Sequence, residues 1–291
     1  MRDLFIDLHT HSSVSDGTEP PAALIRAAVG AGLDVVALTD HDTTAGWAEA
    51  TAAASEAPIT LIPGLELSTR IGYRSVHVLG YLVDPTDAAL VAETARIRER
   101  RMSRARRMVD RIGADHPLTW EDVLDQARPG ATIGRPHIAD ALVQRGLATD
   151  RSAAFRGILH PSSGYYEPHD APDPVAGVAL IKQAGGVPVI AHPAASTRGI
   201  AIDEERLRDL VDAGLGGLEV DHRENQSAGK RTLMEWADRY GLFITGSSDY
   251  HGTGKPNRLG EHRTGPRVFE RIVAEARGAS VVVGPGARTT G

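Results

Sequence analysis

The sequence predicts an α/β barrel that is interrupted by an inserted helical domain. Short apolar runs of strand character alternate with helical stretches in the first and last parts of the chain. A long stretch between these parts has helical spacing and lacks strand signals. Histidines and carboxylates follow several of the apolar runs, at the strand ends where β/α barrels place their active sites.

Residues 1–86 are predicted to form the first part of the barrel. Pro20 and Pro21 suit the start of a helix. The expected strands and helices alternate, except that the last two are both strands. In chain order they are a strand at 4–8, a helix at 20–31, a strand at 35–38, a helix at 44–54, and strands at 59–67 and 76–81.

Residues 87–172 are predicted to form the inserted helical cap domain and a loop. Helical spacing extends to about residue 157, and a loop-rich stretch follows at 159–174. The segment from Arg98 to Arg111 carries seven arginines on one helix. A solvent-exposed helix face is the expected reason for such a charge run, and a surface that faces RNA or phosphate is the alternative.

The barrel pattern resumes at residues 173–283. Helices are expected at 175–184, 204–213 and 228–240, and each precedes a strand, at 187–191, 217–220 and 242–245. The final residues, 284–291, are rich in Gly, Pro and Thr, so they are expected to form a flexible tail.

Composition limits the function classes. The chain has 291 residues, of which 41% are hydrophobic and 24% charged, as in soluble globular proteins. Because there are no cysteines, disulfides and thiolate metal sites are excluded, and any metal must be held by His, Asp or Glu. A formal charge of -6 argues against strong nonspecific binding of nucleic acid over the whole surface.

The expected location is the cytoplasm. Acidic residues near the amino terminus, Asp3 and Asp7, interrupt what would have to be the apolar part of a signal peptide. The longest apolar runs are far shorter than the roughly 20 residues that cross a bilayer, so no membrane association is expected. No protein partner can be inferred.

Metal coordination is the predicted chemistry. The strongest local signal is His9-Thr10-His11, because alternate residues on a strand point the same way and can hold one metal together. For any single histidine a structural hydrogen bond would be an adequate explanation. Six histidines and three carboxylates at the same end of successive β/α units are better explained by metal binding. The predicted ligands are His9, His11, Asp16, His41, Glu66, His77, His192, Asp249 and His251.

This motif set resembles the PHP (polymerase and histidinol phosphatase) family. The matching motifs are His9-Thr10-His11, Thr39-Asp40-His41, His77 with His192, and Ser248-Asp249-Tyr250-His251, and the similarity covers essentially the whole chain. The Gly134-Arg135-Pro136-His137 segment further resembles a subgroup of nucleoside 3',5'-bisphosphate phosphatases, AMP phosphatases and short-RNA 5'-exonucleases. The resemblance implies a distorted seven-stranded (β/α)7 TIM-like barrel, the PHP fold.

The resemblance also implies two or three divalent metals per chain. One metal would take His9, His11, Glu66 and Asp249; a second would share Glu66 and add His77 and His192; a third would take Asp16, His41 and His251. Some family members have histidine in place of Asp16, and a carboxylate there favours manganese, iron or magnesium over zinc. Manganese is the favoured metal. Water that bridges two metals about 3.5–4 Å apart loses a proton near neutral pH and becomes the nucleophile.

Further site residues are predicted with roles in substrate binding and catalysis. Arg135 and His137 are predicted to bind substrate, and Arg135 is expected to hold a phosphate group from the cap. On sequence alone, an exposed arginine in the first turn of a helix is an equal alternative for Arg135, and the family resemblance favours the phosphate contact. His222 is expected to contact phosphate or protonate the leaving group, although a surface histidine is an equal alternative. Asp249, His251 and His222 are the predicted catalytic residues. The second nitrogens of the ligand histidines are expected to be oriented by Asp40, Asp42 and Glu219.

The predicted function is hydrolysis of a phosphate monoester of a small nucleotide, such as a 3',5'-nucleoside bisphosphate or AMP. A 5'-to-3' exonuclease on short RNA is the main alternative. A histidinol-phosphate phosphatase and a noncatalytic metal-binding module are weaker ones. An amidohydrolase is disfavoured because such enzymes use a metal-bridging lysine, and the sequence places Lys182, Lys230 and Lys255 away from the strand ends.

Overall fold

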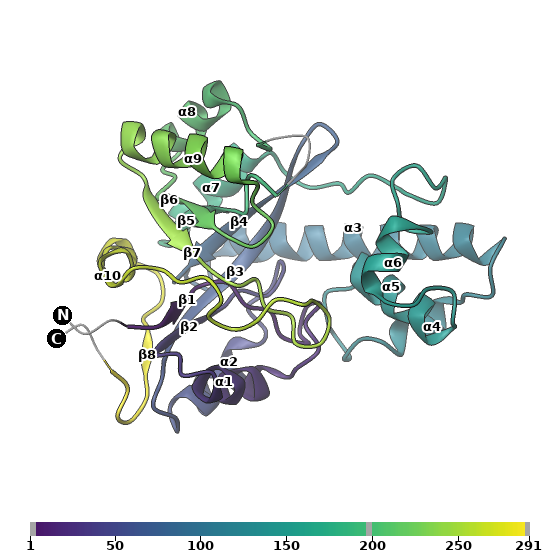
Figure 1. Ribbon diagram of the computed structural model, residues 1–291, viewed down its shortest axis with the longest axis horizontal. Coiled ribbons are helices and arrows are strands. Elements are labelled where there is room, and N and C mark those ends of the chain that lie inside the picture. The colour runs from purple at the N-terminus through teal and green to yellow at the C-terminus, as the bar shows by residue number, and fades with distance from the viewer. Residues whose placement is uncertain (1–3, 196–199, 289–291) are drawn as a thin grey trace.

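Seven strands form one curved, nearly closed sheet in the computed structural model, which describes residues 4–195 and 200–288. The sheet order follows the chain order: β1 (Ile6–Asp7), β2 (Val35–Leu38), β3 (Thr60–Ile71), β4 (Arg74–Tyr81), β5 (Val187–Ala191), β6 (Gly217–Asp221) and β7 (Phe243–Gly246). The two edges approach each other where Thr10 and Tyr250 form an isolated parallel bridge. The predicted distorted seven-stranded barrel is confirmed (Figure 1).

One strand runs against the others. β4 pairs antiparallel with both β3 and β5, whereas the remaining neighbours in the seven-strand order are parallel. His77 lies in the first half of β4, opposite Ser68 and Ala191, and not at the carboxyl end of its strand. Because β4 is reversed, its first half reaches the same edge of the barrel as the carboxyl ends of the parallel strands.

Helices cover the outside of the sheet. They are α1 (Pro21–Gly30), α2 (Trp47–Ala54), α7 (Pro174–Gln183), α8 (Glu204–Asp212), α9 (Ser227–Tyr240) and α10 (Pro266–Glu275). Leu79, Tyr81 and Val187 belong to one buried cluster, and two further clusters join strands to the covering helices. Two elements lie beyond the predicted ones, namely α10 and the short β8 (Val282–Val283), which pairs with β3.

The inserted helices form a lobe beside the barrel, which we call the cap together with the following loop, 157–173. Its helices are α3 (Ala88–Gly113), α4 (Trp120–Leu124), α5 (Arg135–Gln144) and α6 (Arg151–Arg156). Figure 1 shows α3 running from the barrel out to the three short helices. Leu90 and Ile97, in the first half of α3, pack into a barrel cluster, while Met108 and Ile112 pack with α5 in a separate one. The cap therefore has a small core of its own.

Among residues 4–195 and 200–288, no helix is both long and apolar enough to cross a membrane. The predicted flexible tail is held at its first residues. The Gly284 amide donates to the Ile59 carbonyl at 3.0 Å, and the Arg288 guanidinium lies 3.3 Å from the Asp34 carboxylate. Residues 289–291 of this segment lie outside the described part of the chain.

Candidate metal centre

The nine predicted metal ligands converge at one edge of the barrel. They come from the middle of β3, from reversed β4, and from the segments that directly follow β1, β2, β5 and β7. Most of them are buried, and His77 and His192 keep about a fifth of their side chains exposed. Four overlapping groups have ligand atoms within 4.8 Å of one another: His9 with Glu66 and His192; His9 with His11 and Asp249; His11 with Asp16 and His41; and His41 with Glu66 and His77.

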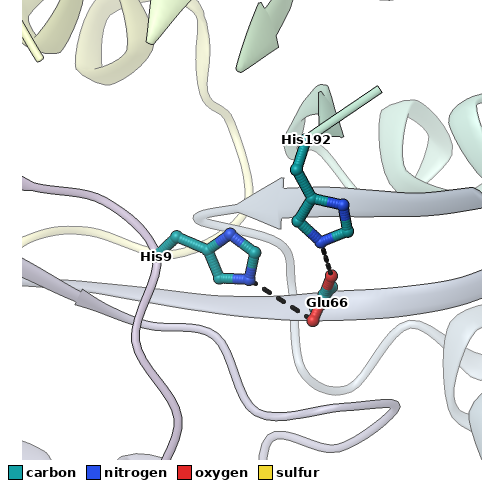
Figure 2. Close-up of side chains that lie close together, drawn as sticks. All are labelled: His9, Glu66 and His192. Carbon is teal, nitrogen blue, oxygen red and sulfur yellow. Dashed lines mark ion pairs between the residues drawn. The ribbon is translucent and has the colours of Figure 1, made fainter. Parts of the chain in front are cut away.

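Glu66 on β3 lies at the centre of these groups. Figure 2 shows its carboxylate between two imidazoles, with Oε2 3.3 Å from His9 Nε2 and Oε1 3.5 Å from His192 Nε2. His77 Nδ1 lies 2.7 Å from Oε1, and His41 Nδ1 lies 3.1 Å from Oε2. The two oxygens of one carboxylate thus face different sets of imidazoles, which is the arrangement that a bridging ligand of two metals requires.

Four atoms define the most compact group. His9 Nε2 and His11 Nε2 are 3.0 Å apart, and Glu66 Oε2 lies 3.3 and 3.1 Å from them. Asp249 Oδ1 lies 3.5 Å from His9 Nε2 and 3.3 Å from His11 Nε2. Five of the six separations among these atoms are therefore 3.0–3.5 Å, and the centre of a tetrahedron with edges of this length lies about 2.0 Å from each corner, which is a metal–ligand distance. These donors are therefore spaced to hold a single ion.

A third set of donors surrounds Asp16. Its Oδ1 lies 3.2 Å from His251 Nε2, and its Oδ2 lies 3.6 Å from His41 Nε2. His11 is shared with this set, because its Nδ1 lies 3.7 Å from Asp16 Oδ1. The structure thus brings together the second and third ligand sets that the family resemblance implies. His77 and His192 meet at Glu66, and His41 and His251 meet at Asp16.

Buried nitrogens without hydrogen bonds support metal occupancy. Among the described residues, His41 Nδ1, His222 Nε2 and His251 Nε2 are buried and make no hydrogen bond, although they lie 3.1, 3.7 and 3.2 Å, respectively, from a carboxylate oxygen. A polar atom that is buried in this way costs free energy unless it has a partner. His41 and His251 belong to the donor sets described above, so bound divalent metals would satisfy their nitrogens. The residues present fit a multinuclear metal site.

The electrostatics of the centre favour charged carboxylates. Burial would raise the pKa of Glu66, but the imidazoles of His41, His77 and His9 hold this pKa well below its usual value. His251 and His41 likewise lower the pKa of Asp16, whereas Lys255 is the largest cause of the lowered pKa of Asp249. Burial would lower the pKa of His11, whereas Asp249 and Glu66 raise it to about 9. The carboxylates that raise the pKa of this imidazole would also attract a bound metal cation.

The predicted orienting carboxylates behave differently from one another. Glu219 on β6 does orient a ligand histidine, since its Oε1 lies 3.0 Å from His9 Nδ1. The prediction is wrong for Asp42, which accepts from the Ser68 amide and hydroxyl and from Arg101. It is also wrong in detail for Asp40.

Asp40 accepts from the hydroxyl groups of Ser12 and Ser15 rather than from an imidazole. Ser15 Oγ lies in turn 3.4 Å from His11 Nδ1, so Asp40 reaches a ligand histidine through one serine. Both carboxylates are buried, and burial raises the pKa of each.

A cavity of about 530 Å³ lies over the centre, between the barrel and the cap. Its lining includes Asp16, His41 and His77 from the metal centre and Arg101, Arg104 and Arg135 from the cap. Arg135 lies over the rings of Phe155 and Tyr166, at 5.2 and 5.5 Å from their centroids. It forms no hydrogen bond or ion pair within residues 4–195 and 200–288, so its guanidinium donors face the cavity unpaired.

The two other residues predicted to contact substrate, His137 and His222, do not line the cavity that Arg135 lines. His137 lines a neighbouring cleft of about 1190 Å³, and its Nδ1 accepts from the Gly134 amide at the start of α5. His222 is fully buried, which excludes the surface-histidine alternative, and its Nε2 lies 3.7 Å from Asp249 Oδ2. His222 therefore adjoins the metal centre, whereas His137 is occupied at a helix start.

Two cap arginines and one lysine add to the predicted site residues. Arg101 and Arg104 lie in the arginine run, for which an exposed helix face was the first expectation and a surface that faces RNA or phosphate the alternative. They line the cavity, and Arg104 is only 9% exposed. Their spacing carried a signal, because Ile97, Arg101, Arg104 and Met108 are three or four residues apart and share one helix face. Lys255 lies 2.6 Å from Asp249 Oδ2, a contact that no local sequence signal predicts.

Comparisons with known proteins agree with this geometry. The family model described as the PHP domain matches residues 7–111. A 3',5'-nucleoside bisphosphate phosphatase from Chromobacterium violaceum is 36% identical over 87% of this chain and 89% of its own length. A phosphoribosyl 1,2-cyclic phosphate 1,2-diphosphodiesterase from Eggerthella lenta is 32% identical, over 84% and 94%. A 5'-3' exoribonuclease from Haemophilus influenzae is 31% identical, over 84% and 89%.

A solved structure extends the similarity to the fold. It is that of a candidate metal-dependent phosphoesterase from Bifidobacterium adolescentis, which superposes with a TM-score of 0.91 at 42% identity and covers 94% of this chain and 96% of that one. One conclusion follows from the identity and coverage of these relatives, from the strand order and from the buried ligand clusters. The chain belongs to the PHP family of metal-dependent phosphoesterases.

Proposed function

We propose that this protein hydrolyses a phosphate monoester of a small nucleotide, such as a 3',5'-nucleoside bisphosphate or AMP. The observation that carries the proposal is the cavity of about 530 Å³ between the ligand clusters and the cap. Ligand pockets of about 300–1,000 Å³ suit molecules of nucleotide size. The cap covers this cavity, so it favours a compact substrate over a folded polymer.

Positive charge on the cap matches an anionic substrate. The cap contributes Arg101, Arg104 and Arg135 to the cavity wall. Among the described lining residues, it contributes no carboxylate. Arginine suits phosphate because its planar guanidinium can donate two parallel hydrogen bonds. Arg135 is our proposed phosphate clamp, since stacking on Phe155 and Tyr166 fixes its plane and leaves its donors free.

The proposed roles of the other residues follow from their positions. His9, His11, Asp16, His41, Glu66, His77, His192, Asp249 and His251 would hold two or three divalent metals, with manganese favoured. Bound metals would polarise the phosphate oxygens and supply an activated water as the nucleophile. Among the proposed catalytic residues, Asp249 and His251 act as ligands. His222, buried beside Asp249, would hold a proton for the leaving oxygen.

A 5'-to-3' exonuclease on short RNA is the second proposed function. The specific observation in its favour is the cleft of about 1190 Å³ between the cap and the barrel loops. It shares Arg151, Ser152, Arg156, Gly254 and Lys255 with the wall of the smaller cavity. Nucleotides beyond the first one could follow this cleft, and their binding would then weaken with salt.

Phosphate release from a panel of substrates tests both functions. The panel holds adenosine 3',5'-bisphosphate, AMP, a short 5'-phosphorylated RNA and histidinol phosphate, each with manganese-loaded and with chelated protein. Metal-dependent release chiefly from the mononucleotides is the expected result. Preference for the RNA, with turnover that falls as salt rises, would replace the phosphatase by the exonuclease. No release from any substrate by metal-loaded protein would leave the noncatalytic alternative.

A further inference from the structure

Lys255 brings a cation to the metal centre from the barrel side. It lies in the loop between β7 and α10, and its Nζ is 2.6 Å from Asp249 Oδ2. The other oxygen of the same carboxylate, Oδ1, faces His9 Nε2 and His11 Nε2. One carboxylate thus separates the ammonium group from the most compact set of metal-binding atoms.

The loop that carries Lys255 is held in place by contacts on both sides. The Asn257 amide nitrogen donates to the Ser248 carbonyl at 2.7 Å, and the Thr253 backbone amide donates to Thr18 Oγ1 at 2.9 Å. Gly254 allows close approach of the cap, because a Cβ atom there would lie 2.1 Å from an Arg151 guanidinium nitrogen. The position of Lys255 is therefore set by the fold.

The ammonium group has donors to spare. A lysine ammonium has three N–H donors, and within residues 4–195 and 200–288 the only hydrogen-bond acceptor of this one is Asp249. One third of the side chain is exposed, and Lys255 lines both the cavity over the metal centre and the larger cleft. It can therefore donate to a bound molecule without releasing Asp249.

Lys255 differs from the other cation that the barrel contributes to this cavity. Arg223 also lines it, but its guanidinium is held by both carboxylate oxygens of Glu261, with Nε and Nη2 at 2.9 and 2.6 Å from them. The remaining cationic lining residues, such as Arg101 and Arg135, come from the cap. A phosphate over the metal centre would meet arginines on the cap side and the Lys255 ammonium on the barrel side.

We propose that Lys255 is a phosphate-binding catalytic residue, which donates from its ammonium group to an oxygen of the substrate phosphate while it remains bound to Asp249. This inference rests on the proposed phosphoester hydrolysis and adds a residue outside the metal-ligand motifs. The contact places a fixed positive charge beside oxygens that gain charge as the ester bond breaks, which lowers the barrier. The residue moves no proton in this role.

The test compares three proteins loaded with manganese: wild type, Lys255→Met and Lys230→Met. Lys230 is a matched control because its Nζ also pairs with a carboxylate, Asp221 at 3.6 Å, but it lines neither cavity. Metal content is measured by mass spectrometry and the binding of inorganic phosphate by calorimetry. The kinetic constants are measured with adenosine 3',5'-bisphosphate. Lys255→Gln is measured alongside, in case the methionine variant does not fold.

Lys255→Met is expected to keep its metal. Its dissociation constant for phosphate should rise and its kcat/KM should fall, each about 10- to 100-fold, as for a lost charge-assisted hydrogen bond. Lys230→Met should match wild type. Unchanged phosphate affinity in the Lys255 variants would overturn the proposal. Loss of metal with unchanged phosphate affinity in reloaded protein would also overturn it, since Lys255 would then only position Asp249. If wild type binds phosphate but hydrolyses no ester, the proposed function fails, and the phosphate measurement still decides the role of Lys255.

Discussion

Glu219 Oε1 lies 3.0 Å from His9 Nδ1, on the side of the imidazole away from Glu66. The other oxygen of Glu219 accepts from the backbone amide of His192 at 2.8 Å. His192 has a positive φ of 30°, a conformation that costs free energy in a residue with a side chain. One buried carboxylate thus fixes the orientation of one ligand histidine and the backbone of another, which approach different oxygens of Glu66.

Replacing Glu219 should weaken metal binding without removing a ligand. In Glu219→Gln the amide oxygen can still face His9, but the amide nitrogen cannot accept from the His192 backbone. We expect metal affinity to fall about 10- to 100-fold, as for other partners of metal-binding histidines. Competition with a chelator of known affinity measures this change. Glu275→Gln is the control, because Glu275 pairs with Arg271 on the exposed face of α10. Equal affinities in the two variants would show that Glu219 does not orient the ligands.

Removal of the metals should destabilise the folded protein. Metals that bind only the folded chain stabilise it by about 2.7 kcal/mol when their free concentration is 100 times the dissociation constant. For a chain of this size, that corresponds to a fall in Tm of roughly 4–5 °C on chelation. Thermal unfolding followed by circular dichroism, with and without chelator and after addition of manganese, measures the shift. An identical Tm in all three samples would argue against a metal bound in the buried clusters.

Arg135→Met should impair substrate binding while the metals stay in place. The guanidinium of Arg135 contacts aromatic rings rather than metal ligands, so its loss should leave metal content unchanged. We expect KM for a nucleotide phosphate to rise about tenfold or more, as for a lost charge-assisted contact. Steady-state kinetics and metal analysis of the same preparation measure both quantities. Unchanged kinetics would remove the clamp role.

Arg101 should couple the cap to the barrel. Its guanidinium donates to Ser68 Oγ at 2.7 Å and to Asp42 Oδ2 at 3.1 Å, and Asp42 follows the ligand His41 directly. Arg101→Met leaves the buried Asp42 carboxylate short of a partner, so we expect a loss of about 1–3 kcal/mol in the free energy of unfolding. Urea unfolding measures this loss. Arg100→Met is the matched control on the same helix, because Arg100 pairs with Asp170 and is half exposed. Similar losses in both variants would contradict the coupling.

The parts of the site that lie on strands or just after them were predictable from sequence. His9 and His11 alternate along the chain, and Glu66 follows an apolar run, so their convergence follows from strand geometry. The direction of β4 was not predicted, because a period of two residues is the same for both directions. The spacing did hold the answer: a connection as short as 68–75 between two predicted strands cannot contain the crossover that parallel strands need.

Contacts between distant segments were beyond local patterns. Asp42 and Asp40 lie beside a ligand histidine in sequence, yet their partners are Ser68 and Arg101 for one, and Ser12 and Ser15 for the other. Lys255 reaches Asp249 only because its loop is folded back by Asn257 and Thr253. Such contacts depend on how loops and the cap dock on the barrel. Sequence periodicity describes the faces of elements but not this docking.

Titration of metal-free protein with manganese, with phosphate release from adenosine 3',5'-bisphosphate as the readout, tests the central claim most directly. The buried ligand clusters predict no turnover in chelated protein and full turnover after two or three equivalents of manganese per chain. Turnover that persists in fully chelated protein, or that is complete after a single equivalent, would contradict a multinuclear metal centre as the source of catalysis.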